Sequence, residues 1–202
     1  MTCIEAPQLD DLEIIFFNQI DFDSPRLAQF INRTPKFRAC DEAHVQFDDR
    51  AVEVNLTYRI HESDSAAFRI KISCREPDWQ LSSIGQVCNS SLRPLSMVEH
   101  LYIEHQYSQL VWKNDTIENT LWLDLLLSFT AVKNLYLSKE FSPGIAATLQ
   151  ELVRGGTTEV LPSLQNIFVE KLRRSRRFPK NIKEFVAARQ LSGRPVAISA
   201  WN

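Results

Sequence analysis

Two pairs of neighbouring acidic and histidine residues are the first candidates for chemistry in this chain of 202 residues. Glu99 precedes His100, and Glu104 precedes His105. A carboxylate beside an imidazole is typical of acid–base catalysis or of a metal site. If this segment is a strand, however, neighbouring residues point to opposite faces, which separates the members of each pair. No cysteine or third histidine lies at metal-ligand spacing nearby, so we expect these side chains to be solvated surface.

Nucleophilic catalysis has little support in the sequence. None of the serines lies in a Gly-x-Ser-x-Gly elbow, and no glycine-rich phosphate-binding loop is present. A hydrolase is the alternative from the enzyme class, and it would require His44 or His100 to meet a serine or a cysteine in a pocket. We therefore predict that the chain is not an enzyme and needs no cofactor or metal.

The cysteines and the apolar runs indicate an intracellular protein. The cysteines are widely spaced and form no Cys-x-x-Cys pair, which favours buried thiols in a reducing compartment over a metal site: Cys3, Cys40, Cys74 and Cys88. No basic and apolar leader is visible at the N-terminus. The longest apolar run, Leu121 to Leu127, is interrupted by Asp124, so no membrane-spanning helix is expected. We expect a location in the cytoplasm, the nucleus or both.

A basic run is the strongest charge feature of a chain whose net charge is −2. Seven lysines and arginines and no acidic residue lie between positions 171 and 183. The basic patch that we select from this run comprises Lys171, Arg173, Arg174, Arg176, Arg177 and Lys180. A solvated loop is the preferred interpretation, with a nuclear-import signal or a weak nucleic-acid contact as alternatives. The overall charge makes nucleic acid an unlikely main partner.

A recurring apolar spacing organises the rest of the chain. Apolar residues spaced by three and then by two positions fit a chain that enters a short strand whose alternate residues face a core. This spacing occurs at Leu9, Leu12 and Ile14, at Val98, Leu101 and Ile103, at Val132, Leu135 and Leu137, and at Leu164, Ile167 and Val169. The repetition indicates an internal repeat.

The period of the repeat predicts the fold class. The spacing starts at Val98, Val132 and Leu164. A further step, as long as the one from Val132 to Leu164, leads to Val196 in a final strand-like run. A slightly shorter step back from Val98 leads to Phe68. A near-regular period within the range of roughly 20–50 residues is typical of a solenoid. We therefore predict a short, irregular α/β solenoid with a mainly parallel sheet and outer helices, with an ordinary α/β layer domain as the alternative.

The expected elements form one domain over residues 1–202, with irregular repeats in 1–66 and more regular repeats in 67–202. A strand is predicted at Leu12 to Phe17. Alternating residues on both sides of Asp48-Asp49-Arg50 predict a β-hairpin. From Phe68 onward strands alternate with helices, which we expect to begin near Glu76, Asp115, Ser142 and Ile182. Parallel pairing follows, because parallel strands need a crossover connection.

Several segments of the second half resemble the C-terminal, leucine-rich-repeat-like region of fungal F-box proteins. They are Cys74-Arg-Glu-Pro-Asp-Trp-Gln-Leu-Ser-Ser, Phe129-Thr-Ala-Val-Lys-Asn-Leu-Tyr-Leu-Ser, Leu149-Gln-Glu-Leu-Val and Phe185-Val-Ala-Ala-Arg-Gln-Leu-Ser-Gly. The resemblance implies a leucine-rich-repeat-like solenoid that recognises a protein substrate of a ubiquitin ligase. Two departures are the strongly basic stretch from Lys171 to Arg177 and the absence of F-box helices before the repeats. Binding of a ubiquitin-ligase adaptor is therefore expected only if an F-box segment lies upstream.

Strand alternation then predicts which side chains face outward on the concave side of the sheet. If Leu101 and Ile103 face the core, Tyr102 faces outward, and Tyr136 and Phe168 join it in one aromatic column. The flanking columns hold His100, Asn134 and Asn166 on one side, and Glu104, Ser138 and Glu170 on the other. These columns either form a surface for a protein partner or only support the sheet by cross-strand stacking. We predict a non-catalytic interaction module, with a truncated paralogue that lacks a partner as a further alternative.

Overall fold

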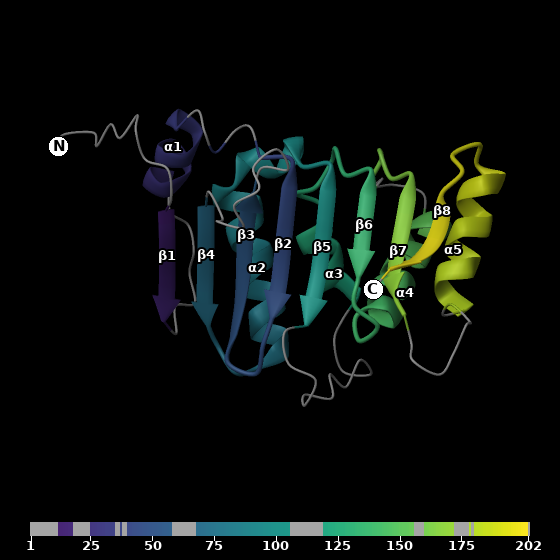
Figure 1. Cartoon of the computed structure of the whole chain (residues 1–202), viewed down its shortest axis with the longest axis horizontal. Helices are drawn as coiled ribbons and strands as arrows, with labels where there is room; N and C mark the ends of the chain where they lie inside the picture. Colours follow the sequence, from purple (N-terminus) through teal and green to yellow (C-terminus); the bar gives the residue numbers. More distant parts are fainter. Residues whose placement is uncertain are drawn as a thin grey trace.

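The structure is a computed structural model that describes residues 12–17, 25–34, 37, 40–57, 68–105, 119–155, 160–171, 178 and 180–201. Strands and helices alternate along most of the chain (Figure 1). The strands are β1 (Leu12–Phe17), β2 (Glu42–Phe47), β3 (Ala51–Thr57), β4 (Phe68–Ser73), β5 (His100–His105), β6 (Asn134–Leu137), β7 (Asn166–Glu170) and β8 (Ala197–Trp201). The helices are α1 (Pro25–Arg33), α2 (Pro77–Ser91), α3 (Asn119–Leu126), α4 (Ser142–Gly155) and α5 (Lys180–Leu191), with a 3₁₀ helix η2 at Arg93–Met97.

The eight strands of the described residues form one sheet in the order β1-β4-β3-β2-β5-β6-β7-β8. From β2 through β5, β6 and β7 to β8 every neighbouring pair is parallel, and β1 is parallel to β4. Strand β3 runs antiparallel to both of its neighbours, β2 and β4. The expectation of a mainly parallel α/β fold is therefore confirmed.

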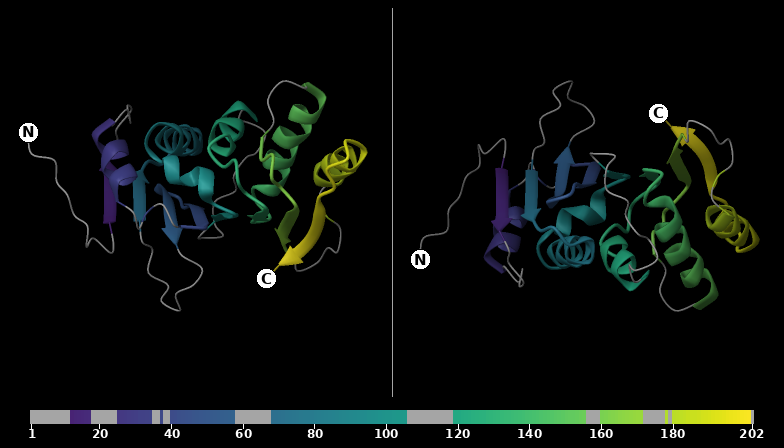
Figure 2. Two further views of the ribbon diagram at one scale, coloured as in Figure 1. Left: turned by 90° about the horizontal axis from the view of Figure 1, so that it is seen from above. Right: turned by 90° about the horizontal axis from the view of Figure 1, so that it is seen from below.

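The helices of the described residues cover one face of this sheet (Figure 2), and consecutive helices pack side by side. Burial alternates along the strands accordingly. In β4 the side chains of Phe68, Ile70 and Ile72 are buried under the helices, whereas those of Arg69 and Lys71 are half-buried on the opposite face. We call the face opposite the helices the open face.

Aromatic side chains join the helical layer to the centre of the sheet. Trp122 of α3 lies edge-on to Phe47 of β2 and to Phe141, with ring centroids 5.9 and 5.5 Å apart. Phe47 and Phe141 are themselves 5.0 Å apart, and all three side chains are buried. Such tilted and edge-on contacts are preferred between aromatic rings, and each adds to the free energy gained by burial. Leu125 on the same helix is also fully buried.

The register of the parallel strands follows the predicted period in part. Asn134 of β6 pairs with His100 of β5, and Asn166 of β7 pairs with Asn134, as the spacing from Val98 to Val132 and on to Leu164 predicts. Ala197 of β8 pairs with Asn166. The predicted step from Leu164 to Val196 is therefore one residue too long.

The predicted step from Phe68 to Val98 is wrong as a step between neighbouring strands. Strand β4, which begins at Phe68, lies between β1 and β3, and β5 pairs with β2 instead. The reason is the topology of the hairpin. From β2 the chain runs back through β3 and β4 toward β1, and α2 then leads it to β5 on the far side of β2.

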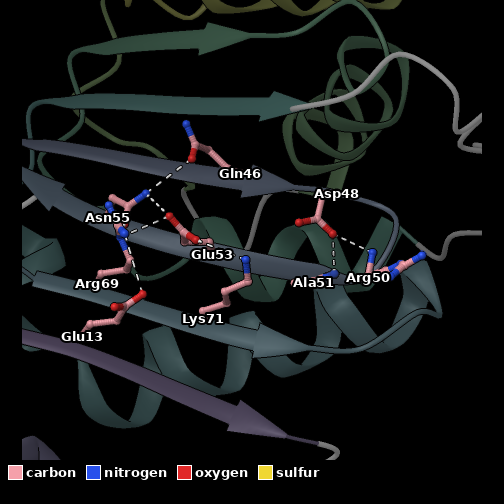
Figure 3. Close-up of polar contacts among 9 residues, drawn as sticks. All are labelled: Glu13, Gln46, Asp48, Arg50, Ala51, Glu53, Asn55, Arg69 and Lys71. Carbon is pink, nitrogen blue, oxygen red and sulfur yellow. Dashed lines mark hydrogen bonds and ion pairs between the residues drawn. The ribbon is translucent and has the colours of Figure 1, made fainter. Parts of the chain in front are cut away.

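The predicted hairpin between β2 and β3 is confirmed, and its turn is closed by Asp48. The Oδ1 atom of Asp48 accepts hydrogen bonds from the backbone N–H groups of Arg50 (2.6 Å) and Ala51 (2.7 Å) (Figure 3). The buried amide of Gln80 in α2 fastens this turn to the helix layer. Its Nε2 atom donates to the backbone oxygens of Asp48 (3.0 Å) and Cys74 (2.7 Å).

Most of the predicted helices agree with the structure. Helices α2, α4 and α5 cover the segments whose starts are predicted at Glu76, Ser142 and Ile182, although α5 begins two residues earlier, at Lys180. The helix start predicted at Asp115, before α3, lies outside the described residues, and so does Leu9 of the first apolar spacing.

Candidate interaction surface on the open face

Four rings on the open face, one from each of β2, β5, β6 and β7, stack in a single row. The register pairs His44 with Tyr102, Tyr102 with Tyr136, and Tyr136 with Phe168. Their centroids are 4.3, 4.1 and 4.5 Å apart, and the planes of each pair lie within 9° of parallel. This spacing follows from the roughly 4.8 Å between neighbouring strands. We call these four residues the aromatic ladder.

The aromatic ladder is a stacked, half-buried surface feature. Every ring in it is half-buried, because the ring faces lie against one another while the ring edges face outward. Stacked aromatic pairs contribute about 0.5–1.5 kcal/mol each beyond their buried area. The structure places Tyr102, Tyr136 and Phe168 in adjacent register, as strand alternation predicts.

Trp201 closes one side of the ladder. Its ring is edge-on to Tyr102 and Tyr136, at centroid distances of 6.2 and 5.8 Å. Its indole Nε1 donates to the backbone oxygen of Leu137 in β6 at 3.3 Å. The side chain therefore reaches from β8 across β7 to β6, and in Figure 1 the end of β8 turns toward β6.

Two residues of this surface are absent from the column predicted from the sequence. His44 lies between Ala43 and Val45, and its outward position in β2 matches that of Tyr102 in β5. The apolar spacing is weak there, because alanine is a small apolar residue, so the spacing does not identify β2 as a neighbour of β5. The outward position of Trp201 follows from alternation in β8, but the reach of its side chain does not.

The predicted polar column beside the ladder is a row of hydrogen-bonded side chains. The Nδ2 atom of Asn134 lies 3.3 Å from Nδ1 of His100, and Nδ2 of Asn166 donates to Oδ1 of Asn134 at 2.8 Å. His100 is only 6% exposed, so the expectation that it is solvated surface is wrong. The reason is its position inside the sheet, between Glu42 of β2 and Asn134 of β6.

On the other side of the ladder, Glu104 is held by side chains of β2. Its Oε2 atom accepts a hydrogen bond from Nε2 of Gln46 at 3.1 Å and lies 3.5 Å from Nδ1 of His44. Burial alone would raise the pKa of Glu104, but the hydrogen bonds from His44 and Gln46 together lower it. Because Nε2 of His44 also lies 3.9 Å from Glu42, this imidazole stands between two carboxylates.

The remaining members of this predicted column serve the backbone of the sheet. Ser138 is 5% exposed, and its Oγ accepts the backbone N–H of His105 at 3.2 Å. Oε2 of Glu170 accepts the backbone N–H of Lys139 at 3.3 Å. The column of Glu104, Ser138 and Glu170 is therefore not a continuous row of solvated groups.

The two neighbouring Glu–His pairs are separated, as strand alternation predicts. Glu99 forms an ion pair with Lys133 at 2.6 Å, and the hydrogen bond from Lys133 lowers the pKa of Glu99. His105 packs against Phe141, with centroids 6.0 Å apart, and partial burial lowers its pKa. Neither pair provides a carboxylate and an imidazole that act together.

A charged cluster occupies the other half of the open face, on β1, β4 and β3 (Figure 3). Nε of Arg69 donates to Oδ1 of Asn55 at 2.9 Å and lies 3.4 Å from Oε1 of Glu53, while its Nη1 lies 3.7 Å from Glu13. Nζ of Lys71 lies 3.9 Å from Oε2 of Glu53, and Asn55 donates to Oε1 of Glu53 at 2.6 Å. Two acidic and two basic residues thus neutralise each other in this half of the face.

Only the ends of the predicted basic patch lie within the described residues. Lys171 is exposed, and Lys180 forms an ion pair with Glu184, four residues later in α5, at 3.4 Å. Arg173, Arg174, Arg176 and Arg177 lie outside the described residues.

The described histidines and cysteines bear on the alternatives of a metal site and of a nucleophile. Within the described part of the chain, no three His, Cys, Asp or Glu side chains could together hold a metal ion. The imidazole nitrogens of His44 face carboxylates, and Nδ1 of His100 faces Asn134. No disulfide joins Cys40, Cys74 and Cys88, and burial raises the pKa of Cys88, which keeps this thiol protonated.

Comparisons with known protein families, with curated proteins and with solved structures find no match for this chain. Among the helices of the described residues, none has the length and apolar character needed to cross a membrane.

Proposed function

We propose that this chain is a non-catalytic protein-interaction module that binds a protein partner on its open face. The observation that carries the proposal is the aromatic ladder, which lies on a face of the sheet that the described helices leave uncovered (Figure 2). Aromatic side chains on a preformed surface make good anchors for a partner. Because stacking already fixes the rings, little side-chain entropy is lost when a partner binds.

We further propose that the module is a short, irregular leucine-rich-repeat-like solenoid. The nearly equal steps between the paired residues His100, Asn134, Asn166 and Ala197 of β5, β6, β7 and β8 support this fold. A backbone hydrogen bond also recurs at the start of these strands. The backbone oxygen of the residue before one strand accepts the N–H of the first residue of the next strand. The N–H of Asn134 donates to the oxygen of Glu99 at 3.0 Å, and the N–H of Asn166 donates to the oxygen of Lys133 at 2.9 Å. In this proposal β3 and β4 are an insertion between two repeats.

The proposed role resembles that of the substrate-recognising part of an F-box protein. Specificity would then come from the residues that surround the ladder, among them Glu104, Glu170 and Trp201. The polar row of His100, Asn134 and Asn166 would chiefly hold the strands in register. Recruitment of a ubiquitin-ligase adaptor belongs to this proposal only if an F-box segment lies upstream of Met1.

A pair of triple variants tests the proposal. The ladder variant replaces Tyr102, Tyr136 and Phe168 by threonine, which removes the rings but retains a high preference for strands. The control variant replaces Leu101, Leu135 and Ile167 by valine on the same three strands, facing the helices. Both variants lose some stability, but only the first changes the open face.

We expect the wild-type chain and the control variant to capture the same proteins from an extract of the source organism. The ladder variant, shown to be folded by circular dichroism, should lose them. If the folded ladder variant captured the same proteins in the same amounts, the ladder would have only a supporting role in the sheet and the proposal would be wrong.

A further inference from the structure

The aromatic ladder ends at β7, although the sheet continues to β8. The register places Ser199 of β8 next to Phe168, at the position that a fifth ring would occupy. Ser199 is exposed, and so is Ala197, which precedes it on the same face of the strand. The hydroxymethyl group of Ser199 is too small to cover an aromatic ring. The face of Phe168 that is turned away from Tyr136 therefore adjoins an exposed serine and not another ring, and we call this position the fifth place.

Three carboxylates occupy outward positions around the ladder. The outward positions on β2, β5 and β7 include Glu42, Glu104 and Glu170, and no lysine or arginine occupies an outward position of β2, β5, β6 or β7. The Gln46 amide and the backbone N–H of Lys139 bind Glu104 and Glu170 without neutralising them, whereas the His44 imidazole lies between Glu42 and Glu104. The charged cluster on β1, β4 and β3 is balanced. The carboxylate nearest to the fifth place is that of Glu170, two residues after Phe168 on the same face, whereas Glu104 and Glu42 lie three and four strands away, about 14–19 Å at roughly 4.8 Å per strand, where salt screens their charges.

We propose that the fifth place receives an arginine side chain from an extended segment of the partner. This inference rests on the proposed function and names the chemistry of the partner. A guanidinium group is planar, stacks on aromatic rings and is weakly hydrated, so it suits a ring face that lies close to the carboxylate of Glu170. A lysine would satisfy the charge but lacks the planar shape. A partner ring would stack on Phe168 but would gain nothing from the carboxylate of Glu170.

A short peptide tests this inference directly. The probe is an acetylated and amidated Gly-Ser-Gly-Arg-Gly-Ser-Gly peptide, compared with the same peptide carrying neutral citrulline, which keeps the planar shape. Titration of the full chain is followed by NMR of the Phe168 ring and the Ser199 amide. We expect saturable shifts of both signals and about two- to fivefold tighter binding of the arginine peptide. Added salt should narrow this difference. Equal binding of the two peptides, or the absence of shifts at both positions, would overturn the inference.

Matched variants separate this inference from the proposed function. Ser199→Phe fills the fifth place with a ring of the chain itself and should abolish the peptide-induced shift of Phe168. Ala200→Phe is the control, because consecutive positions of a strand point to opposite faces and Ala200 is exposed as well. If Ser199→Phe bound the arginine peptide and the captured protein like Ala200→Phe, the fifth place would be refuted while the ladder remained the interface. If the threonine ladder variant also kept its partner, the proposed function would fail too.

Discussion

Replacement of Gln80 by alanine should loosen the attachment of the β2–β3 hairpin to the helix layer. Gln80 is 1% exposed, and its Nε2 atom donates to the backbone oxygens of Asp48 and Cys74 at 3.0 and 2.7 Å. One amide thus joins the hairpin turn and the end of β4 to the first turn of α2. The hairpin includes β2, which places His44 in the aromatic ladder, so this contact also supports the proposed surface.

The expected loss of stability follows from these two hydrogen bonds. A buried polar group that loses its partner costs about 1–3 kcal/mol. Asp48 and Cys74 are both half-buried, so water replaces part of each lost bond. We therefore expect Gln80→Ala to lower the free energy of unfolding by about 2–4 kcal/mol, which includes a contribution from the cavity that is left.

Urea unfolding, followed by tryptophan fluorescence, to which the buried Trp122 contributes, measures this change. Gln80→Glu is the informative companion because it keeps the shape but places a carboxylate against two carbonyl oxygens. This arrangement raises the pKa of the new carboxyl in the folded state above its unfolded value. Its destabilising effect is therefore complete at neutral pH and decreases as the pH falls through the folded-state pKa. A Gln80→Ala variant within about 0.5 kcal/mol of wild type would refute this account of the hairpin.

Two further predictions concern the core and the pH dependence of stability. Leu125→Ala should lower the free energy of unfolding by about 2–5 kcal/mol because it leaves a cavity beneath α3. Leu127→Ala, at a position 36% exposed, should change it by less than about 1 kcal/mol. Equal effects of the two substitutions on urea unfolding would mean that α3 packs differently. Burial lowers the pKa of His105, so as the pH falls below about 6.5 the unfolded chain takes up a proton that the folded chain does not. The unfolding free energy should therefore decrease from neutral pH toward about pH 5, and His105→Phe should make this decrease shallower; an unchanged slope would exclude His105 as its source.

The regular half of the sheet can be predicted because its signal is local. The spacing at Val132, Leu135 and Leu137 places alternate side chains on one face, and the same spacing recurs where β5 and β7 begin. Because the same spacing occurs on neighbouring parallel strands, Tyr102, Tyr136 and Phe168 lie in one row. No long-range information is needed beyond the order of consecutive strands.

The strand order in the first half cannot be predicted from the same signal. The pairing of β4 with β1 and of β2 with β5 joins segments that a hairpin and a crossover separate in the sequence. The strand at Phe68 has a clear alternating pattern, but alternation identifies a strand without naming its neighbours. Counting residues back from Val98 therefore selects the wrong neighbour.

The polar residues beside the ladder are less predictable than the rings. Alternation assigns His100 to the open face, but its burial depends on the side chains of Glu42 and Asn134 in neighbouring strands. The place of Trp201 beside Tyr102 depends on the path of the last strand and on the length of its side chain. Both are properties of the tertiary structure rather than of the local sequence.

Hydroxyl-radical labelling of the wild-type chain, alone and with its captured partner, tests the central claim most directly. Oxidation of Tyr102, Tyr136 and Phe168 reports on the open face, while Trp79 of α2, which is 58% exposed, reports on the helix layer. We expect the partner to protect the three ladder residues and to leave the oxidation of Trp79 unchanged. Protection of Trp79 with unchanged oxidation of the ladder would place the interface on the helices and contradict the account.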